Sequence, residues 1–324
     1  MILQTLYPVE EVSAMIHERK KLLLAGDAKL LSQLPKGDWI GACTPRFIIY
    51  PEQKVETYDK IFVSKLPDFA TGVTICEYGA DTIKNIFIDG PKNGFTVLST
   101  PFGSPISTEY MINVGSYENF AVHPVCGYVS GEPHHPEKSF TISGIGPNIH
   151  PNKIVAMHVS LPETKYAEIH TFNPYKQGNG DSIVFDRGGM VLKDVYINGK
   201  KKNFAEYLTE VKYDTNIPLV ANYSGEQVNI VINMIEGDHV LMATSVLENI
   251  EYRPAVINYA ISEPEVISDK VFFSMTCMSN FVNPEIRARF LKRMNGPVSF
   301  GGIAYHFIGC TTIYLTIDDI QTEK

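Results

Sequence analysis

The chain has 324 residues, of which 44% are hydrophobic, and its formal net charge is -8 at a pI near 5.6. This length fills two ordinary domains, because single domains commonly hold roughly 100 to 200 residues. The acidic balance leaves no surplus of lysine and arginine to neutralise the phosphates of nucleic acid or an anionic membrane surface, so we expect neither partner.

Cysteine usage and the first residues predict the compartment. The five cysteines are odd in number, widely scattered and contain no C-x-x-C pair, which indicates reduced thiols rather than a disulfide framework. The chain start lacks a basic segment followed by an apolar stretch, and no apolar run approaches the length of a membrane span. We therefore predict a cytoplasmic protein without a membrane partner.

The N-terminal part begins with helical patterns and then changes to strands. Pro8 suits a first helical turn, and an apolar stripe predicts a helix over residues 7–25 that ends at Gly26. Asp27 is expected to cap a second helix that runs to Leu34. Short apolar and β-branched runs then predict strands at residues 39–44, 47–50, 60–64, 72–78, 85–88 and 95–100.

Residues 127–153 are rich in glycine, proline, histidine and serine. This composition is typical of a connection, so we predict a domain boundary there, with one unit over residues 1–140 and a similarly built unit over residues 141–324.

The second half continues with strands and two capped helices. Strands are expected at residues 154–161, 168–172, 182–185, 256–261 and 271–277. Asn203 should cap one helix, and Asn283 with Pro284 should begin another that ends before Gly296. Strands outnumber helices without strict alternation, so the expected class is a strand-rich α+β fold of two sheet-and-helix units.

Four segments carry a resemblance to a known family. Residues 273–277 form a strand-like run that ends in a cysteine before a helix, and residues 299–304 form a double-glycine loop before the last strand. Residues 195–200 read as a strand with a Gly-Lys turn, and residues 39–44 as a strand that ends in small residues. These elements resemble the FIST family of intracellular ligand-sensing domains over most of the chain.

The resemblance implies a sensory protein that binds a small molecule and signals through a separate partner protein. Where the family has a Gly-Glu pair in each half, this chain has Pro45-Arg46 in the first and Gly302 in place of the second glutamate. The ligand should therefore carry a different charge from that of relatives, either because another molecule binds or because Arg46 holds an anion. Thr44 and Arg46 are the expected ligand-binding residues of this half.

The C-terminal loop supplies the other expected ligand-binding residues. Gly301 and Gly302 would let backbone amides approach a ligand, although paired glycines also mark bulges or close packing. His306 follows the loop, and haem stays open as a ligand because some FIST-like proteins are thought to bind it through an imidazole. Cys277 completes the set, although a buried cysteine that only packs is the commoner case.

An enzyme is the alternative function. Cys277 and His306 could act as nucleophile and base of a hydrolase or transferase. No Walker loop, G-x-S-x-G elbow or H-E-x-x-H motif is present. His123, Cys126 and the pair at residues 134–135 could supply zinc ligands, but their spacing matches no structural zinc pattern. We therefore expect no metal and leave the cofactor open.

Overall fold

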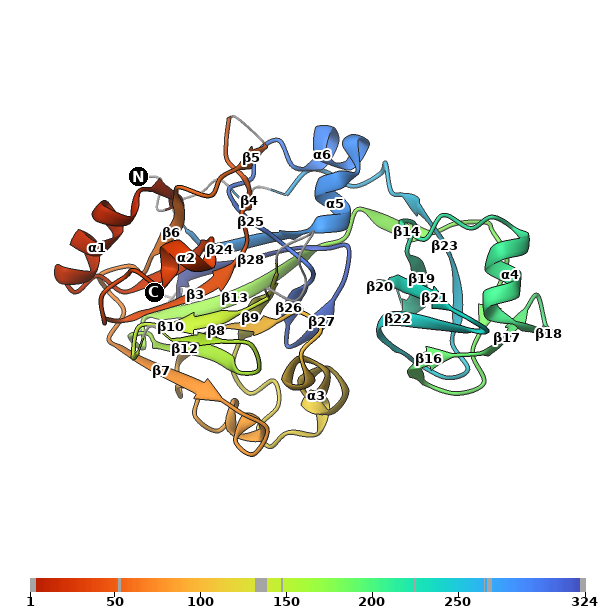
Figure 1. Ribbon diagram of the computed structural model, residues 1–324, viewed down its shortest axis with the longest axis horizontal. Helices are drawn as coiled ribbons and strands as arrows, with labels where there is room; N and C mark the ends of the chain where they lie inside the picture. Colours follow the sequence, from red (N-terminus) through yellow and green to blue (C-terminus); the bar gives the residue numbers. More distant parts are fainter. Residues whose placement is uncertain are drawn as a thin grey trace. The chain divides into compact units, whose positions relative to one another are not determined.

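The computed structural model describes residues 4–51, 54–131, 139–146, 148–223, 225–264, 266 and 270–320. The chain divides into two compact units. Unit 1 comprises residues 1–172, 263–306 and 312–324, and unit 2 comprises residues 173–262 and 307–311. Strands outnumber helices in both units (Figure 1), which confirms the predicted α+β class.

The predicted boundary at residues 127–153 is not where the units divide. Strand β10 (Thr141–Ser143) pairs with β3 (Trp39–Cys43), and β12 (Ile154–Ser160) pairs with β8 (Gly94–Pro101). Strands from both sides of that stretch therefore share sheets. Unit 2 is instead inserted after residue 172, and the chain returns to unit 1 at residue 263. The division into residues 1–140 and 141–324 is corrected accordingly.

Unit 1 contains three copies of one strand arrangement, here called repeats 1, 2 and 3. Repeat 1 contains β1 (Gln4–Tyr7), α1 (Val9–His17), β2 (Leu22–Gly26), α2 (Ala28–Leu31), β3, β4 (Arg46–Ile48), β5 (Val55–Glu56) and β6 (Ile61–Lys65). Repeat 2 contains β7 (Gly72–Tyr78), η1 (Ile83–Asn85), β8, α3 (Pro105–Asn113), η2 (Val114–Ser116), β9 (Val125–Ser130), β10, β11 (Ile149–His150) and β12. Repeat 3 contains β13 (Lys165–Phe172), β24 (Val271–Cys277), α5 (Met278–Val282), α6 (Pro284–Phe290), β25 (Gly296–Ser299), β26 (Gly302–Ala304), β27 (His306–Ile308) and β28 (Thr312–Asp319), although the last two residues of β27 are assigned to unit 2.

The repeats share one topology and exchange strands in a cycle. Each has a parallel strand pair connected through helices, namely β2 with β3, β8 with β9, and β24 with β25. The three sheets have the orders β1-β6-β2-β3-β10-β11, β7-β12-β8-β9-β26-β27 and β13-β28-β24-β25-β4-β5. Strands β10 and β11 of repeat 2 thus complete the sheet of repeat 1. In the same way, β26 and β27 of repeat 3 complete the sheet of repeat 2, and β4 and β5 of repeat 1 complete the sheet of repeat 3. This pseudo-threefold exchange makes unit 1 one body.

Three sequence positions recur at equivalent places in the repeats. They are a glycine (Gly41, Gly127, Gly296), a hydroxyl residue three positions later (Thr44, Ser130, Ser299) and an isoleucine (Ile48, Ile142, Ile303). Each isoleucine is the register partner of a glycine from another repeat. A Cβ at Gly127 would lie only 2.0 Å from the carbonyl oxygen of Leu98. The glycine therefore lets two parallel strands approach closely.

The helices are short, and their predicted caps are largely confirmed. The side chains of Asp27, Asn203 and Asn283 each accept a backbone N–H bond at the start of a helix. The helix predicted over residues 7–25 is wrong at its end, because residues 22–26 form β2, whose five residues are all buried. The strand predicted at residues 85–88 is also wrong, because the chain forms η1 and turns there. None of the helices in the described ranges is long and apolar enough to cross a membrane.

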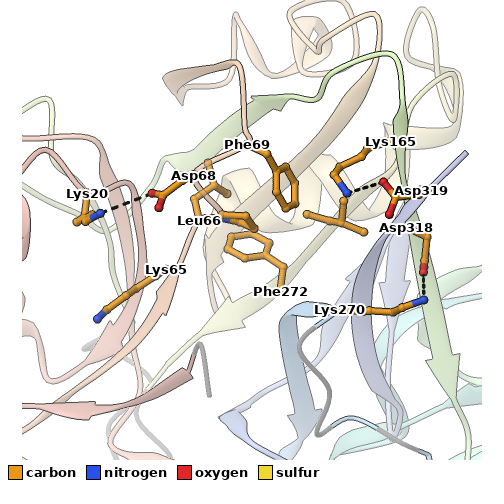
Figure 2. A pocket seen from close by; sticks show the side chains of 12 residues that line it. Lys20, Lys65, Leu66, Asp68, Phe69, Lys165, Lys270, Phe272, Asp318 and Asp319 are labelled. Atoms are coloured by element: carbon orange, nitrogen blue, oxygen red, sulfur yellow. Dashed lines mark hydrogen bonds and ion pairs between the residues drawn. The ribbon is translucent and has the colours of Figure 1, made fainter. Parts of the chain in front are cut away.

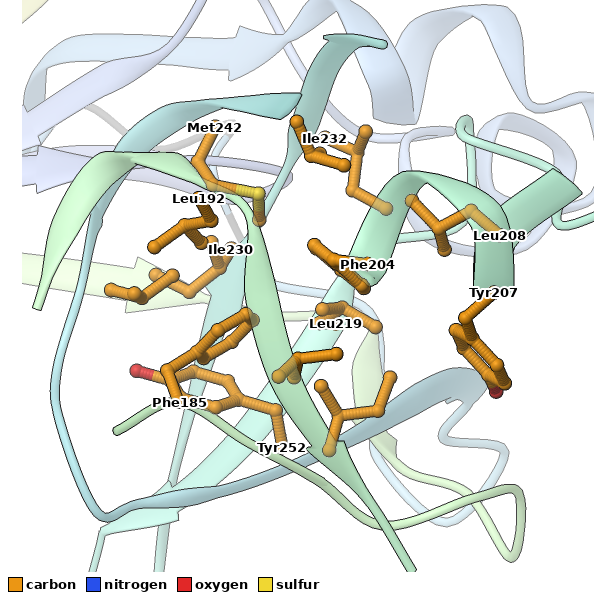
Figure 3. Packing of buried hydrophobic residues seen from close by; sticks show 14 of the residues in the cluster. Phe185, Leu192, Phe204, Tyr207, Leu208, Leu219, Ile230, Ile232, Met242 and Tyr252 are labelled. Carbon is orange, nitrogen blue, oxygen red and sulfur yellow. The ribbon is translucent and has the colours of Figure 1, made fainter. Parts of the chain in front are cut away.

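Unit 2 has another arrangement. Its elements are β14 (Tyr175–Gln177), β15 (Ile183–Val184), β16 (Gly189–Leu192), β17 (Asp194–Ile197), β18 (Lys200–Asn203), α4 (Phe204–Glu210), β19 (Leu219–Tyr223), β20 (Glu226–Ile230), β21 (Ile232–Glu236), β22 (His239–Val246) and β23 (Glu251–Ile257). They form antiparallel sheets of seven and three strands. Phe185 packs between Phe204 and Tyr252 in the core (Figure 3), with ring centroids 5.4 and 5.5 Å apart. The similarity expected between halves is found instead among the repeats of unit 1.

Candidate functional site

The predicted residue Thr44 belongs to a ring of hydroxyl groups that joins the three repeats. In this hydroxyl ring, Thr44 Oγ1 donates to Val298 O at 2.7 Å, Ser130 Oγ accepts from Cys43 N at 2.8 Å, and Ser299 Oγ accepts from Val129 N at 3.1 Å. Each hydroxyl thus bonds to the backbone of the equivalent residue of another repeat, and all three residues are buried. The ring ties the cyclic strand exchange together, since a buried polar group needs such a partner.

Arg46 lies at the start of β4, where its guanidinium already has neighbours. Its Nε is 3.2 Å from Glu56 Oε2, and its Nη1 is 3.7 Å from Met278 Sδ. Because Met278 directly follows Cys277, the structure brings Thr44, Arg46 and Cys277 into one region where repeats 1 and 3 meet. An anionic ligand at Arg46 would have to compete with Glu56.

Close packing accounts for the paired glycines. A Cβ at Gly302 would lie 2.2 Å from Ile313 Cδ1 and 2.9 Å from Met275 Sδ, and both neighbours are buried. Gly302 therefore faces the core of unit 1 and not an open cleft wall. Gly301 is also buried, and its carbonyl accepts a bond from Ser299 Oγ at 2.6 Å.

Cys277 and His306 have different neighbours. Cys277 is buried at the end of β24, and its Sγ lies 3.8 Å from Ser279 Oγ. The imidazole of His306 lies 4.8 Å from the ring of Phe120, and desolvation lowers the pKa of His306. The pairing of Cys277 as nucleophile with His306 as base stays a hypothesis.

Repeat 2 contains a buried polar network that the sequence did not reveal. Tyr78 donates to Asp89 at 2.9 Å and lies 2.8 Å from His158 Nε2. Thr96 Oγ1 lies 2.7 Å from His158 Nδ1 and 3.0 Å from His123 Nε2. Desolvation lowers the pKa of His158 to about 4 and also lowers that of His123. Both imidazoles are therefore neutral at pH 7, and the network holds the segments around Asp89 and His123 against the sheet.

The zinc hypothesis gains no support from these positions. His123 is part of the buried network, Cys126 is buried in β9, and residues 134–135 lie outside the described residues. Within the described part of the chain, no three histidine, cysteine, aspartate or glutamate side chains are grouped so that they could hold a metal ion.

A pocket of about 700 Å³ lies at the amino-terminal ends of β2 and β24 in unit 1. Leu66, Phe69 and Phe272 form its apolar floor (Figure 2), together with Ile317. Leu66 and Phe272 are buried, whereas the ring of Phe69 is partly exposed to the pocket. This concave apolar surface with charged groups around it is the arrangement that small-molecule sites commonly have.

Three ion pairs surround the apolar floor. They are Lys20 with Asp68 at 3.5 Å, Lys165 with Asp319 at 2.7 Å, and Lys270 with Asp318 at 2.6 Å. Lys165 Nζ also lies 4.6 Å from the centroid of the Phe69 ring, which adds a cation–π contact. Bonding to Lys270 lowers the pKa of Asp318, so this carboxylate stays ionised at neutral pH. A smaller pocket of about 500 Å³ adjoins and adds Tyr166 and Ile320.

The predicted site residues and this pocket do not overlap. The pocket residues come from the end of β6, the start of β13, the start of β24 and the end of β28. Their local sequence, such as Lys65-Leu66-Pro67-Asp68-Phe69, resembles an ordinary strand exit. The one available signal was the alternation of charged and aromatic residues there, which is too common to identify a site.

Comparison with known proteins gives the family. No curated protein matches this sequence. A family of unknown function (DUF6976) matches residues 7–318, which span nearly all of unit 1 and the whole inserted unit 2. With a match over this length, the chain belongs to the family of unknown function DUF6976.

Proposed function

We propose that this protein binds a small molecule in the pocket of unit 1. The observation that carries the proposal is the combination of a cavity of about 700 Å³, an apolar floor and convergent charged groups. Sites for small molecules and cofactors typically occupy about 300 to 1,000 Å³ and pair apolar walls with a few polar groups. The pocket has these properties and lies within unit 1, where residues from two packed sheets would contact a ligand.

The resemblance to the FIST family adds a sensory role to this proposal. A cytoplasmic sensor would pass its bound state to a separate protein, and the chain offers a route for such a signal. Strand β13 carries Lys165 at one end and leads into unit 2 after Phe172 at the other. Strand β28 carries Asp319 and begins directly after residues 307–311 of unit 2. A ligand at the pocket would thus contact two strands that continue into the inserted unit.

A thermal-shift screen with matched variants tests ligand binding. A molecule that binds only the folded state raises the apparent melting temperature. At a ligand concentration of a hundred times its Kd, it adds about 2.7 kcal/mol to the free energy of unfolding. We expect hits with the parent and with Ile112→Ala, which removes an exposed apolar side chain from α3 outside the pocket. The same compounds should lose their effect on Phe69→Ala. Hits that stabilise Phe69→Ala as strongly as the parent would place the ligand elsewhere.

A further inference from the structure

In two of the ion pairs around the pocket, the lysine is less exposed than the aspartate. The Lys165 side chain is 21% exposed and its partner Asp319 is 77% exposed. Lys20 and Asp68 are exposed by 44% and 92%. In both pairs the lysine side chain is therefore the less exposed partner, and the aspartate is largely in contact with solvent.

In the third pair the aspartate is less exposed than the lysine, and this aspartate lies on the other face of β28. Asp318 is 22% exposed, whereas Lys270 is 64% exposed. Successive strand residues point to opposite faces, so Asp319 shares a face with Ile317 of the floor, whereas Asp318 lies on the face of its register partner Tyr166. The less exposed charged side chains on the face of the apolar floor are thus those of lysines.

Lys165 has contacts besides its ion pair with Asp319. Its backbone N–H donates to Pro162 O at 2.9 Å, and its carbonyl accepts a bond from Asn93 Nδ2 at 3.1 Å. Its ammonium lies over the Phe69 ring, while the Asp319 carboxylate is mostly in water. An exposed ion pair contributes little to stability, so an incoming anion can replace Asp319 at small cost.

We infer that the ligand of this pocket is an amphipathic anion, with a carboxylate, sulfonate or phosphate head bound to Lys165 in place of Asp319. Its aliphatic or aromatic body lies on Phe69, Leu66 and Phe272. The inference rests on the proposed function and adds the chemical class of the ligand. A cationic head is disfavoured because it would meet the ammonium groups of Lys165 and Lys20.

Competition with a fluorescent anion tests the head-group charge. Anilinonaphthalene sulfonate serves as the probe, and decanoate, decanol and decyltrimethylammonium serve as competitors that share a chain length and differ in charge. Decanoate should displace the probe at a concentration roughly 10-fold lower than decanol, because a charge-assisted contact adds to the apolar one. Decyltrimethylammonium should be the weakest of the three.

Paired variants assign the contact to Lys165. Lys165→Met keeps most of the apolar stem and should weaken the binding of decanoate roughly 10-fold without weakening the binding of decanol. Lys165→Arg keeps the positive charge and should keep most of the affinity for decanoate. Asp319→Asn removes the competing carboxylate and should tighten decanoate about threefold. Lys29→Met changes an exposed lysine of α2 outside the pocket and is the matched control, which should leave the affinity for decanoate unchanged. Circular dichroism confirms that each variant is folded.

The outcomes separate this inference from the proposed function. Equal displacement by decanoate and decanol, with both weakened by Phe69→Ala, overturns the anionic class and leaves ligand binding in the pocket intact. The inference is also overturned if Lys165→Met and Asp319→Asn leave the affinity of decanoate unchanged. Probe binding that Phe69→Ala does not reduce, or no binding at all, contradicts both proposals.

Discussion

The pocket side of repeat 1 and the buried network of repeat 2 occupy equivalent places in the same strand frame. Lys65 pairs in register with Leu22 of β2, and His158 pairs with Thr96 at the equivalent position of β8. Each also contacts an equivalent tyrosine. Lys65 Nζ lies 5.1 Å from the Tyr7 ring, and His158 Nε2 lies 2.8 Å from the Tyr78 hydroxyl.

The difference between these places follows from the two side chains. A lysine stays charged at neutral pH and its ammonium is costly to bury, so the sheet end of repeat 1 stays open to solvent. A histidine can be neutral and can bond through both ring nitrogens, so repeat 2 closes over His158. One backbone frame thus supports an accessible charged pocket in one repeat and a sealed polar network in another.

The largest effect is expected from the glycines that allow close strand contact. Gly127→Ala should destabilise the protein by roughly 3 kcal/mol or more, because the new Cβ would meet backbone atoms of Leu98 that cannot move alone. Gly41→Ala should cost less, since its nearest neighbour is a side-chain methyl of Ile142 at 2.9 Å. Urea denaturation measures both, with Gly79→Ala as a control because no atom lies within 4 Å there. An equal loss of stability in Gly127→Ala and Gly79→Ala would refute the close packing at Gly127.

Replacing the two equivalent polar residues separates the regions directly. His158→Ala should cost about 2 to 3 kcal/mol, because it opens a cavity and removes one hydrogen-bond partner each from Thr96 and Tyr78. Lys65→Ala should change stability by less than about 1 kcal/mol, because its ammonium is solvated. Chemical denaturation of both variants provides the comparison. Similar costs at the two positions would show that repeat 2 is not sealed as described.

The acid sensitivity of stability should come from repeat 2. The pKa of His158 is about 4 in the folded protein, below its value of about 6.5 in an unfolded chain, so the unfolded state binds more protons as the pH falls. His158 alone should therefore cost about 2 kcal/mol of stability between pH 7 and pH 5. His123 adds to this loss, whereas Tyr78 keeps its proton and the Asp89 carboxylate faces the network and opposes the lowering of the His158 pKa.

Two variants separate the contribution of His158 to the pH dependence from that of the surface carboxylates, because the carboxylates titrate in both variants. His158→Gln should flatten the pH dependence of the unfolding free energy relative to the parent. Lys65→Gln should leave the pH dependence as it is, since a lysine does not titrate in this range. A His158→Gln curve parallel to that of the parent would contradict the neutral buried imidazole.

The hydroxyl ring should give the smallest effect per residue. Ser299→Ala and Ser130→Ala should each destabilise unit 1 by about 1 kcal/mol, the usual net value of one buried hydrogen bond. Because the bonds close a cycle among the repeats, the double variant should cost more or less than the sum of the single ones. Thermal unfolding of the single and double variants measures the coupling. Strict additivity would mean that the three bonds act independently.

The sequence predicted the local elements better than their assembly. The caps at Asp27, Asn203 and Asn283 depend on short-range bonds, and they were found where expected. Residues 22–26 were assigned to a helix because their apolar pattern suits either structure, and only burial between layers decides for a strand. Local patterns could not show which strands of other repeats would cover them.

The repeat and the pocket show two different limits of prediction. The spacing of Gly41, Thr44 and Ile48 recurs without change in Gly296, Ser299 and Ile303, so this repeat was visible in the sequence. Repeat 2 hides it because its copy of the motif is lengthened between Ser130 and Ile142. The pocket could not be predicted in this way, because its residues lie far apart along the chain and only the packing of β6 against the sheet of repeat 3 brings them together.

Hydrogen exchange with the tightest-binding compound of the thermal-shift screen tests ligand binding in the pocket most directly. The account predicts new protection of amides at residues 65–69 and 317–319, which line the pocket, and unchanged exchange at the equivalent end of β12 near His158. Protection centred on residues 44–46 and 299–302, with none at the pocket, would contradict the account and return the site to the loops that the sequence first indicated.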